Sequence, residues 1–513
     1  MTRSGVRGRL DRLRATGASA LERRLSVDRR ALAALRVALG LLLFADLLLR
    51  SRALAAHYTD SGVLPRSALR ATHGPLADLS LHALSGGVAL QVALFSVAGL
   101  AALALAAGYR TRLAAAVSWL LLVSLHARNP LVLNAGDSLL RRLLFWGLFL
   151  PLGSAWSLDA LARERDESIE NSGDDEERER GALTVATAAI LIQVVLVYAV
   201  NAVIKLRGEA WLEGTAVRYV FGIDHLTILL GDALAGHPAI LAPLAHAWLA
   251  LLVLSPLLIL LTGWPRALLA GAFALGHLGM AFTLRLGPFP FVSIAALLSF
   301  LPSRVWDAAE RRFRRVTEPR IRTRAARQAR ALAGRLPRGP VLPTNARVTA
   351  GRAARVVAAA LLAAVLLWNA VSVGLAPAPP EVRAASEEYR WDMFAPEPRS
   401  TDGWYVAPAT LASGGRVDAW NGGAVSWTPP ADTASTFPTH RWLVYLLDLQ
   451  RPGGAPLRDE FGAYLCDRWA ARHDSRLTNV SVVYVERPVR LDEAAASAPT
   501  RRVDLGTYRC GAD

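Results

Sequence analysis

Long apolar runs separated by short polar segments dominate the hydrophobic pattern of this chain. Each run approaches the roughly 20 residues that an α-helix needs to cross the hydrocarbon core of a bilayer. The pattern therefore predicts a predominantly α fold, a polytopic helical membrane bundle with about nine spans. The predicted spans are 31–50, 88–107, 111–126, 138–153, 184–205, 241–262, 267–285, 288–302 and 354–374.

The polar segments divide the chain into a membrane part and a small soluble part. After the last span, a proline-rich linker at 376–383 leads into shorter alternating stretches. Strands expected at 403–411, 415–420 and 480–485 and a helix at 457–472 indicate a small C-terminal α+β domain. The predicted division is a basic arm at 1–30, a membrane domain at 31–302, an arginine-rich linker at 303–353, the last span at 354–374 and the α+β domain at 380–513.

The charge distribution predicts the orientation in the membrane. The net charge is +16, and the arginines lie beside apolar runs, which favours anionic membrane lipid over nucleic acid as the partner. The positive-inside rule places 1–30 and 303–353 in the cytoplasm, and an odd number of spans then places 376–513 outside. The acidic stretch 163–180 is expected to be a solvated, disordered cytoplasmic loop. We expect an integral plasma-membrane protein with an extracytoplasmic C-terminal domain.

Both cysteines of the chain, Cys466 and Cys510, lie in the C-terminal domain. Their number excludes Cys₄ zinc and iron–sulfur sites, and no metal is expected. An outer location allows a disulfide, with two buried thiols as the alternative. The domain is also rich in tryptophan, which indicates an aromatic core in preference to an exposed binding face; the residues are Trp391, Trp404, Trp420, Trp427, Trp442 and Trp469.

Lys205 is the only lysine in the chain; every other basic side chain counted with it is arginine. Arginine keeps its charge in proteins, whereas a desolvated lysine releases its proton readily. Lys205 ends the apolar run 186–204, and an ionisable residue within a membrane segment is a candidate functional residue. The alternative is a lysine that extends to the headgroups, but that role does not require lysine over arginine.

Other polar residues collect at the predicted outer ends of the spans. Amines, imidazoles and carboxylates together on one side of a bundle are typical of an acid/base site for a lipid-dissolved substrate. His277 lies within the seventh span and is grouped with Lys205 as a candidate catalytic residue. The candidate substrate-binding residues are Tyr58 and Asp60 in the first outer loop, His126, Asn134 and Asp137 in the second, and Trp211 and Glu213 after Lys205.

Several of these residues have simpler interpretations. Asp137 can pair with Arg141 at i,i+4 on a helix. His277 can form an interhelical hydrogen bond, and His126 can cap a span end. Tyr58 can belong to the aromatic belt at the headgroups.

Three stretches resemble a known membrane domain: HYTDSGVLPR at 57–66, NPLVLNAGDSLLRRLLFWGLFLPLGSAWSLDAL at 129–161, and NAVIKLRGEAWLEGTAV at 201–217. Over about 30–302 the chain is similar to the HTTM domain, which is related to the vitamin K-dependent γ-glutamyl carboxylase. Two motifs carry the resemblance, together with a similar tail, WDMFAPEP, at 391–398. They are Lys205 followed by Trp211, Leu212, Glu213 and Gly214, and His277 ten residues before Gly287, Phe289, Pro290, Phe291 and Val292.

The resemblance implies a quinol-dependent carboxylase or epoxidase, either a lyase or an oxidoreductase. Lys205 would deprotonate a reduced quinone cofactor, vitamin K hydroquinone or menaquinol, and His277 would hydrogen-bond the quinone or an intermediate. Oxygen would convert the quinol to an epoxide through a strongly basic alkoxide, which would take a glutamate γ-proton before CO₂ adds. A protein or peptide at the outer face is then a candidate substrate.

The chain departs from the carboxylase pattern in three places. The run from Asn134 to Asp137 lacks the histidine that follows an asparagine pair in the carboxylase. The membrane part has no cysteine, and the C-terminal domain is short, without an obvious propeptide-binding region. These departures leave the fold and the quinol pocket better supported than carboxylation. The alternative function is a non-catalytic membrane scaffold that binds a partner through its C-terminal domain; the inverted repeat typical of a transporter is absent from the sequence.

Overall fold

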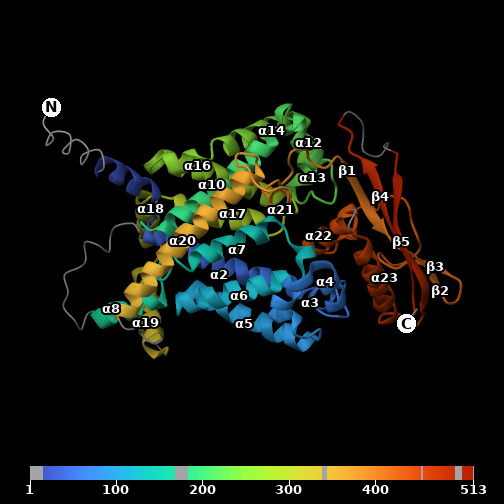
Figure 1. Cartoon of the computed structure of the whole chain (residues 1–513), viewed down its shortest axis with the longest axis horizontal. Coiled ribbons are helices and arrows are strands. Elements are labelled where there is room, and N and C mark those ends of the chain that lie inside the picture. The colour runs from blue at the N-terminus through green and yellow to red at the C-terminus, as the bar shows by residue number, and fades with distance from the viewer. Residues whose placement is uncertain (1–14, 168–182, 338–343, 452–453, 492–498, 512–513) are drawn as a thin grey trace.

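The computed structural model describes residues 15–167, 183–337, 344–451, 454–491 and 499–511. Long helices run side by side along the molecule, and a β-sheet lies at one end (Figure 1). Residues 1–14 of the predicted basic arm and 168–180 of the acidic stretch 163–180 lie outside the described residues.

Five helices among the described residues are long and apolar enough to cross a membrane. Helix α17 (Phe289–Leu297) continues into the short helix η4 (Leu298–Phe300), and the two together are bent by 106° relative to α18 (Ser303–Val316). If this bent pair counts as one span, the number rises to six. The chain is therefore a multi-span helical membrane protein. The five helices are α2 (Arg29–Ser51), α5 (Val88–Ala107), α10 (Val185–Lys205), α16 (Gly263–Thr283) and the Thr349–Ser372 part of α20 (Thr344–Ser372).

The predicted count of nine spans is therefore too high by this measure. The run 111–126 forms α6 (Thr111–Arg128), whose polar ends lower its hydropathy, and the run 138–153 forms the 13-residue α7 (Ala135–Gly147). The run 241–262 breaks near Pro256 into α14 (Pro238–Val253) and α15 (Leu257–Leu260). An apolar run in the sequence does not reveal such breaks. Five spans keep the odd number on which the predicted orientation rests, whereas six would not.

The two ends of the molecule differ in charge. The segment predicted as an arginine-rich linker forms α18, α19 (Pro319–Arg335) and the start of α20, because arginine and alanine both favour helix. Figure 1 shows α18 and α19, together with α8 (Leu158–Glu167), at the end opposite the β-sheet. The predicted orientation, with the arginines on the inner side and the C-terminal domain on the outer side, requires such a separation; which end faces the cytoplasm stays a prediction.

Short helices connect the long ones near the β-sheet end. They are α3 (Leu54–Tyr58), α4 (Arg66–His73), η1 (Gly74–Leu79), η2 (Leu81–Ala83), η3 (Pro130–Val132), α11 (Glu209–Leu212), α12 (Ala216–Phe221) and α13 (Leu230–Ala235).

The C-terminal region is α+β, as predicted, with an antiparallel sheet in which β4 (Leu477–Pro488) pairs with three other strands. The expected strands and the expected helix are present, but α21 (Pro380–Glu388) begins inside the predicted linker. The sequence also did not predict α22 (His440–Leu449) or β5 (Arg501–Arg509). The remaining elements are β1 (Thr401–Val406), β2 (Pro408–Leu411), β3 (Arg416–Asp418), η5 (Thr433–Thr436) and α23 (Ala455–Ala470).

Cys466 of α23 and Cys510 after β5 form a disulfide. Of the two alternatives for the cysteines, the structure thus shows the bridge, and disulfides persist in oxidising compartments. The bridge is typical of an extracytoplasmic domain. The aromatic-core prediction is also confirmed, because five of the six tryptophans are buried and only Trp427 is partly exposed.

The C-terminal region packs against the membrane part over a shared core. One buried apolar cluster joins Tyr58 and Val63 of the membrane part to Trp442 and Tyr445 of α22. The hydroxyl of Tyr445 also donates to the carbonyl oxygen of Val63 at 3.4 Å. The end of the helices next to the β-sheet is thus covered, and the covering elements contribute to the cavity described next.

Candidate functional site

An apolar cavity of about 660 Å³ lies among α10, α12, α14, α16 and the segment that precedes β1. Leu244 of α14 and Leu275 of α16 line it and are also 44% and 69% exposed. The cavity therefore reaches the surface of the bundle between these two helices, one of which is a candidate membrane span. A hydrophobic molecule dissolved in the bilayer can enter by this route. The volume is in the range of cavities that bind small molecules and cofactors.

Lys205, the last residue of α10, contributes a buried amine to this cavity. Its Nζ donates to the carbonyl oxygens of Met393 at 2.9 Å and Phe394 at 3.1 Å. The Trp211 ring lies beneath it, with 3.4 Å between Nζ and the ring centroid. No carboxylate of the described residues forms an ion pair with Lys205. Among the described residues, neutral dipoles and a π face are the groups in direct contact that would stabilise a positive charge here, and Asp392 adds a more distant attraction.

The tail-like segment 391–398 lies against the end of α10. The Asn201 amide donates to the carbonyl oxygens of Trp391 at 3.0 Å and Met393 at 3.2 Å. The Trp211 indole donates to the Phe394 carbonyl oxygen at 2.7 Å. These contacts place the Met393 and Phe394 side chains in the cavity wall. The segment WDMFAPEP, singled out in the sequence, therefore forms part of the site.

His277 lies behind the cavity wall. Its ring is fully buried, and its Nε2 is 3.0 Å from the hydroxyl of Tyr198, which does line the cavity. Trp248 and Phe289 pack on the ring with centroid distances of 5.3 and 5.5 Å. The contact is an interhelical hydrogen bond between α10 and α16, so His277 acts on the cavity through Tyr198.

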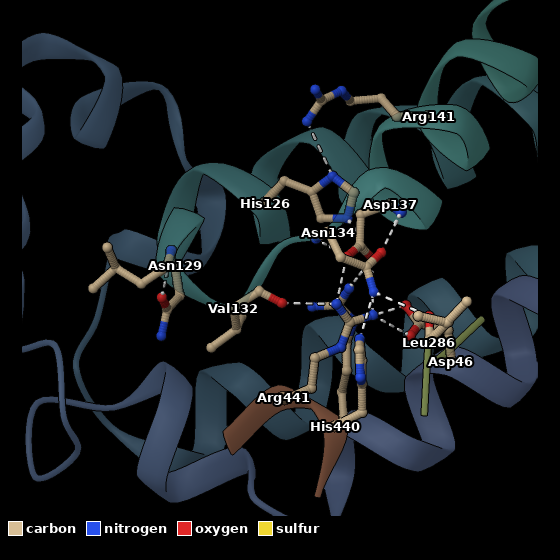
Figure 2. A network of polar contacts seen from close by, with 12 residues as sticks. Asp46, His126, Asn129, Val132, Asn134, Asp137, Arg141, Leu286, His440 and Arg441 are labelled. Carbon is tan, nitrogen blue, oxygen red and sulfur yellow. Dashed lines mark hydrogen bonds and ion pairs between the residues drawn. The ribbon is translucent and has the colours of Figure 1, made fainter. Parts of the chain in front are cut away.

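Asn134 lines the cavity together with His440, which comes from the C-terminal region. Asn134 caps α7: its Oδ1 accepts from the backbone N–H of Asp137 at 3.2 Å. Its Nδ2 lies 2.5 Å from His440 Nε2, as Figure 2 shows. Because the amide oxygen is already used, the amide N–H is the donor and the imidazole nitrogen is the acceptor.

Asp137 lies outside the cavity, in a buried charge cluster with Asp46, Arg50 and Arg441. Figure 2 shows Asp46, Asp137 and Arg441 of this cluster. Arg50 is 2.7 Å from Asp46 and 2.5 Å from Asp137. Arg441 of α22 is 2.8 Å from Asp46 and also pairs with Asp137. Two carboxylates thus face two guanidinium groups, which is the balance that buried charges require. The alternative interpretation of Asp137, a pair with Arg141, is not observed: no such ion pair appears among the described residues.

The other predicted residues do not reach the cavity. His126 lies next to the charge cluster, with Nε2 3.7 Å from Asp137, and its Nδ1 is 3.2 Å from Arg141. The buried hydroxyl of Tyr58 accepts from Arg50 at 2.7 Å, so Tyr58 is no interfacial belt residue. Asp60 pairs with Arg66 at 2.8 Å where both side chains are partly exposed, and Glu213 is exposed. The predicted residues that line the cavity are Lys205, Trp211 and Asn134.

Sequence reasoning missed Tyr198, Asn201 and His440 at the cavity. Tyr198 and Asn201 precede Lys205 by seven and four positions, so a helical projection places them on its face. His440 carries no such signal, because it reaches the cavity only through the packing of α22.

The buried histidines predict how stability depends on pH. Burial and the nearby charge of Arg441 lower the pKa of His440 to about 4, and the same causes lower the pKa of His57 to about 3. The ordinary pKa is about 6.5, so at lower pH the unfolded chain binds protons that the folded chain does not. We expect the free energy of unfolding to fall as the pH drops from about 6.5 towards 4, by up to about 1.4 kcal/mol per histidine per pH unit. Thermal unfolding in detergent tests this; His440→Phe should give a shallower profile, and a flat wild-type profile would contradict it.

The described residues contain no group of three or more His, Cys, Asp or Glu side chains that could hold a metal ion. Comparison of the chain with protein-family models, with curated proteins and with solved structures finds no match. Function is therefore inferred from the cavity and the residues that line it.

Proposed function

We propose that this membrane protein binds a lipid-soluble quinol in the cavity and that Lys205 accepts a proton from one quinol hydroxyl. The observation that carries the proposal is a buried amine, without a carboxylate partner, in the wall of an apolar cavity that reaches the bundle surface. A quinol has a flat apolar ring, a hydrocarbon tail and two hydroxyl groups. This chemistry suits a cavity with a long apolar lining and a few polar groups.

The contacts of Lys205 suit a proton acceptor. A neutral amine has two N–H groups and one lone pair, and the carbonyls of Met393 and Phe394 provide one acceptor for each N–H. The lone pair then remains for the proton of a bound hydroxyl. The ammonium that forms keeps both carbonyls and gains attraction to the Trp211 ring. Arginine cannot take this role, because its guanidinium does not release a proton in proteins.

Dioxygen is the proposed second reactant, on the basis of the resemblance to the carboxylase superfamily. The reaction balances as quinol plus O₂ giving quinone epoxide plus water, and the quinol supplies both hydrogen atoms of the water. A glutamyl side chain as proton donor, with CO₂ as a further reactant, would make the full carboxylase reaction. The protein or peptide that this would need belongs to the proposal as a candidate partner at the outer face.

A non-catalytic scaffold is the second candidate function, and one observation favours it. The same two hydrogen bonds from Lys205 fasten the segment 391–398 to the end of α10. A lysine with only that role could be replaced by arginine without loss. The two candidates therefore differ in whether the wild type oxidises menaquinol and whether Lys205→Arg abolishes that activity; the scaffold has none, and arginine at this position keeps its fold.

The proposed function is tested by anaerobic addition of menaquinol to the purified protein in detergent, followed by oxygen. We expect menaquinone epoxide above the non-enzymatic background. Folded protein that neither binds menaquinol nor yields epoxide would contradict the proposal.

Blocking the cavity mouth should prevent binding. Gly279 of α16 lines the cavity, and a side chain added there would meet open space, so Gly279→Phe is expected to fill the mouth without disturbing the helix. We expect its affinity for menaquinol, measured by titration of tryptophan fluorescence, to fall about 10- to 100-fold. Gly271→Phe is the matched control, because Gly271 is on the same helix, has equal free space and does not line the cavity. Equal affinities for the two variants would exclude this cavity as the binding site.

A further inference from the structure

The end of the cavity near Lys205 has its N–H groups already in use. The two N–H groups of a neutral Lys205, the two of the Asn201 amide and the one of the Trp211 indole all point to backbone carbonyls of the segment 391–394. Three carbonyl oxygens, those of Trp391, Met393 and Phe394, accept all five. The C-terminal segment therefore determines which hydrogen-bonding groups remain for a ligand.

What remains at this end are acceptors. Both contacts of the Asn201 amide are to carbonyl oxygens, so the contacting atom must be Nδ2 and the other atom is the amide oxygen Oδ1. No described residue donates a hydrogen bond to Oδ1. Because Oδ1 is also absent from the fully buried atoms that have no partner, it is accessible. Asn201 lines the cavity one helical turn before Lys205. An unpaired acceptor and the lone pair of a neutral Lys205 thus lie on one face of α10.

We infer that Asn201 is a specificity-determining residue, whose Oδ1 accepts a hydrogen bond from a ligand hydroxyl and so favours the reduced quinol over the oxidised quinone. The inference rests on the proposed function. A quinone carbonyl at this position would place its lone pairs against an acceptor, and both groups would stay unpaired in an apolar cavity. A site that accepts a hydrogen bond from a ligand hydroxyl discriminates strongly against an analogue without that hydroxyl. An apolar pocket discriminates much less against an analogue that carries one additional group.

The hydroxyl of Tyr198 does not change this preference. It lies on α10, one turn further from Lys205, and is hydrogen-bonded to His277 at 3.0 Å. A phenol both donates and accepts, so Tyr198 can serve either form of the ligand. The discrimination is assigned to the Lys205 end of the cavity, where the neighbouring N–H groups are taken.

The consequence for a catalytic cycle is release of the product. Conversion of the quinol to an epoxide replaces both hydroxyls by carbonyls, which removes the hydrogen atoms that Asn201 and Lys205 accept. The product is then held less tightly than the substrate. No movement of the segment 391–398 is needed for this difference.

The test is anaerobic titration of the full-length protein with three ligands: menaquinol, menaquinone and the dimethyl ether of menaquinol. The ether keeps the ring and the tail but has no hydroxyl to donate. We expect menaquinol to bind about tenfold or more tightly than the other two ligands. A site in which Oδ1 accepts one well-placed hydrogen bond and a site in which Oδ1 stays unpaired differ in affinity by about this factor. In Asn201→Leu the preference for menaquinol should fall at least about threefold below that of the wild type, and the lone pair of Lys205 accounts for the preference that remains.

A control separates the acceptor from the docking of the segment. Arg142 lies over the Trp391 ring, 4.6 Å from its centroid, and does not line the cavity. Arg142→Met should weaken the docking of the segment while keeping the preference for menaquinol. An unchanged preference in Arg142→Met and a reduced preference in Asn201→Leu would together support the inference.

Three outcomes would overturn it. Equal wild-type affinities for menaquinol and menaquinone would show binding without discrimination, which leaves the proposed function standing and removes the role of Asn201. A similar loss of affinity for all three ligands in Asn201→Leu would assign Asn201 to packing alone. No binding of any of the three ligands to the folded wild type would instead remove the proposed function itself.

Discussion

Lys205→Arg is expected to lower the rate of menaquinol oxidation by about 10²- to 10⁴-fold, the usual contribution of a general base. Arginine keeps the positive charge and can still donate to the carbonyls of Met393 and Phe394, so the segment 391–398 should stay docked. What is lost is a nitrogen that can exchange its proton with the ligand. Initial rates at saturating menaquinol, with the product separated from substrate, measure the effect.

The control for this variant is its stability. A Tm within a few degrees of wild type would show that the loss of rate is chemical and does not come from unfolding. Lys205→Met should lose both the rate and part of the docking, because methionine donates no hydrogen bond. Wild-type turnover in Lys205→Arg would contradict the role of Lys205 as a base, whereas no turnover in either folded protein would favour the non-catalytic scaffold.

Asp137→Asn is expected to destabilise the protein by about 3–5 kcal/mol, the usual cost of removing one partner from a buried ion pair. Arg50 and Arg441 would both remain buried with Asp46 as the only carboxylate of the cluster. Because Arg441 comes from α22, the loss should also loosen the C-terminal region from the membrane part. The shift in Tm in a mild detergent measures the effect.

Two further variants show whether burial is the cause. Asp60→Asn removes a carboxylate from a partly exposed pair with Arg66 and should cost less than about 1 kcal/mol. The double variant Asp137→Asn/Arg441→Gln should cost less than the sum of its single variants, because it removes opposite charges together. Additive effects, or equal effects at Asp60 and Asp137, would contradict the described cluster.

The sequence predicted the long helices well because each is encoded locally. The expected spans 31–50, 88–107 and 184–205 correspond to Arg29–Ser51, Val88–Ala107 and Val185–Lys205. The length of an apolar run and the lack of charge within it are sufficient for such a prediction. Hydropathy overcounts membrane spans where an apolar run contains a break, as near Pro256, because it averages over the interruption.

Part of the cavity was also accessible from sequence. The uniqueness of Lys205 and its place at the end of an apolar run identified it, and Trp211 followed from the motif that contains both. The position of His277 depends on the rotation of α16 about its axis, which places Tyr198 between His277 and the cavity. Sequence spacing alone does not determine that rotation to within one residue.

The charge cluster and His440 depend on contacts between distant parts of the chain. Arg441 and Asp46, which pair at 2.8 Å, are 395 positions apart, and no local pattern links them. The i,i+4 pair Asp46–Arg50 inside the first apolar run was a readable signal, because charges within a membrane segment need partners. Its two further partners become visible only once α7 and α22 are packed against α2.

The most direct test of the proposed site is an electron cryomicroscopy map of the protein with menaquinol bound under anaerobic conditions. The account predicts density for the ring inside the cavity of about 660 Å³, with one ring oxygen about 2.7–3.2 Å from Lys205 Nζ and the tail leaving between α14 and α16. A ring bound elsewhere on the protein, with this cavity empty or filled by a lipid acyl chain, would contradict the assignment of Lys205.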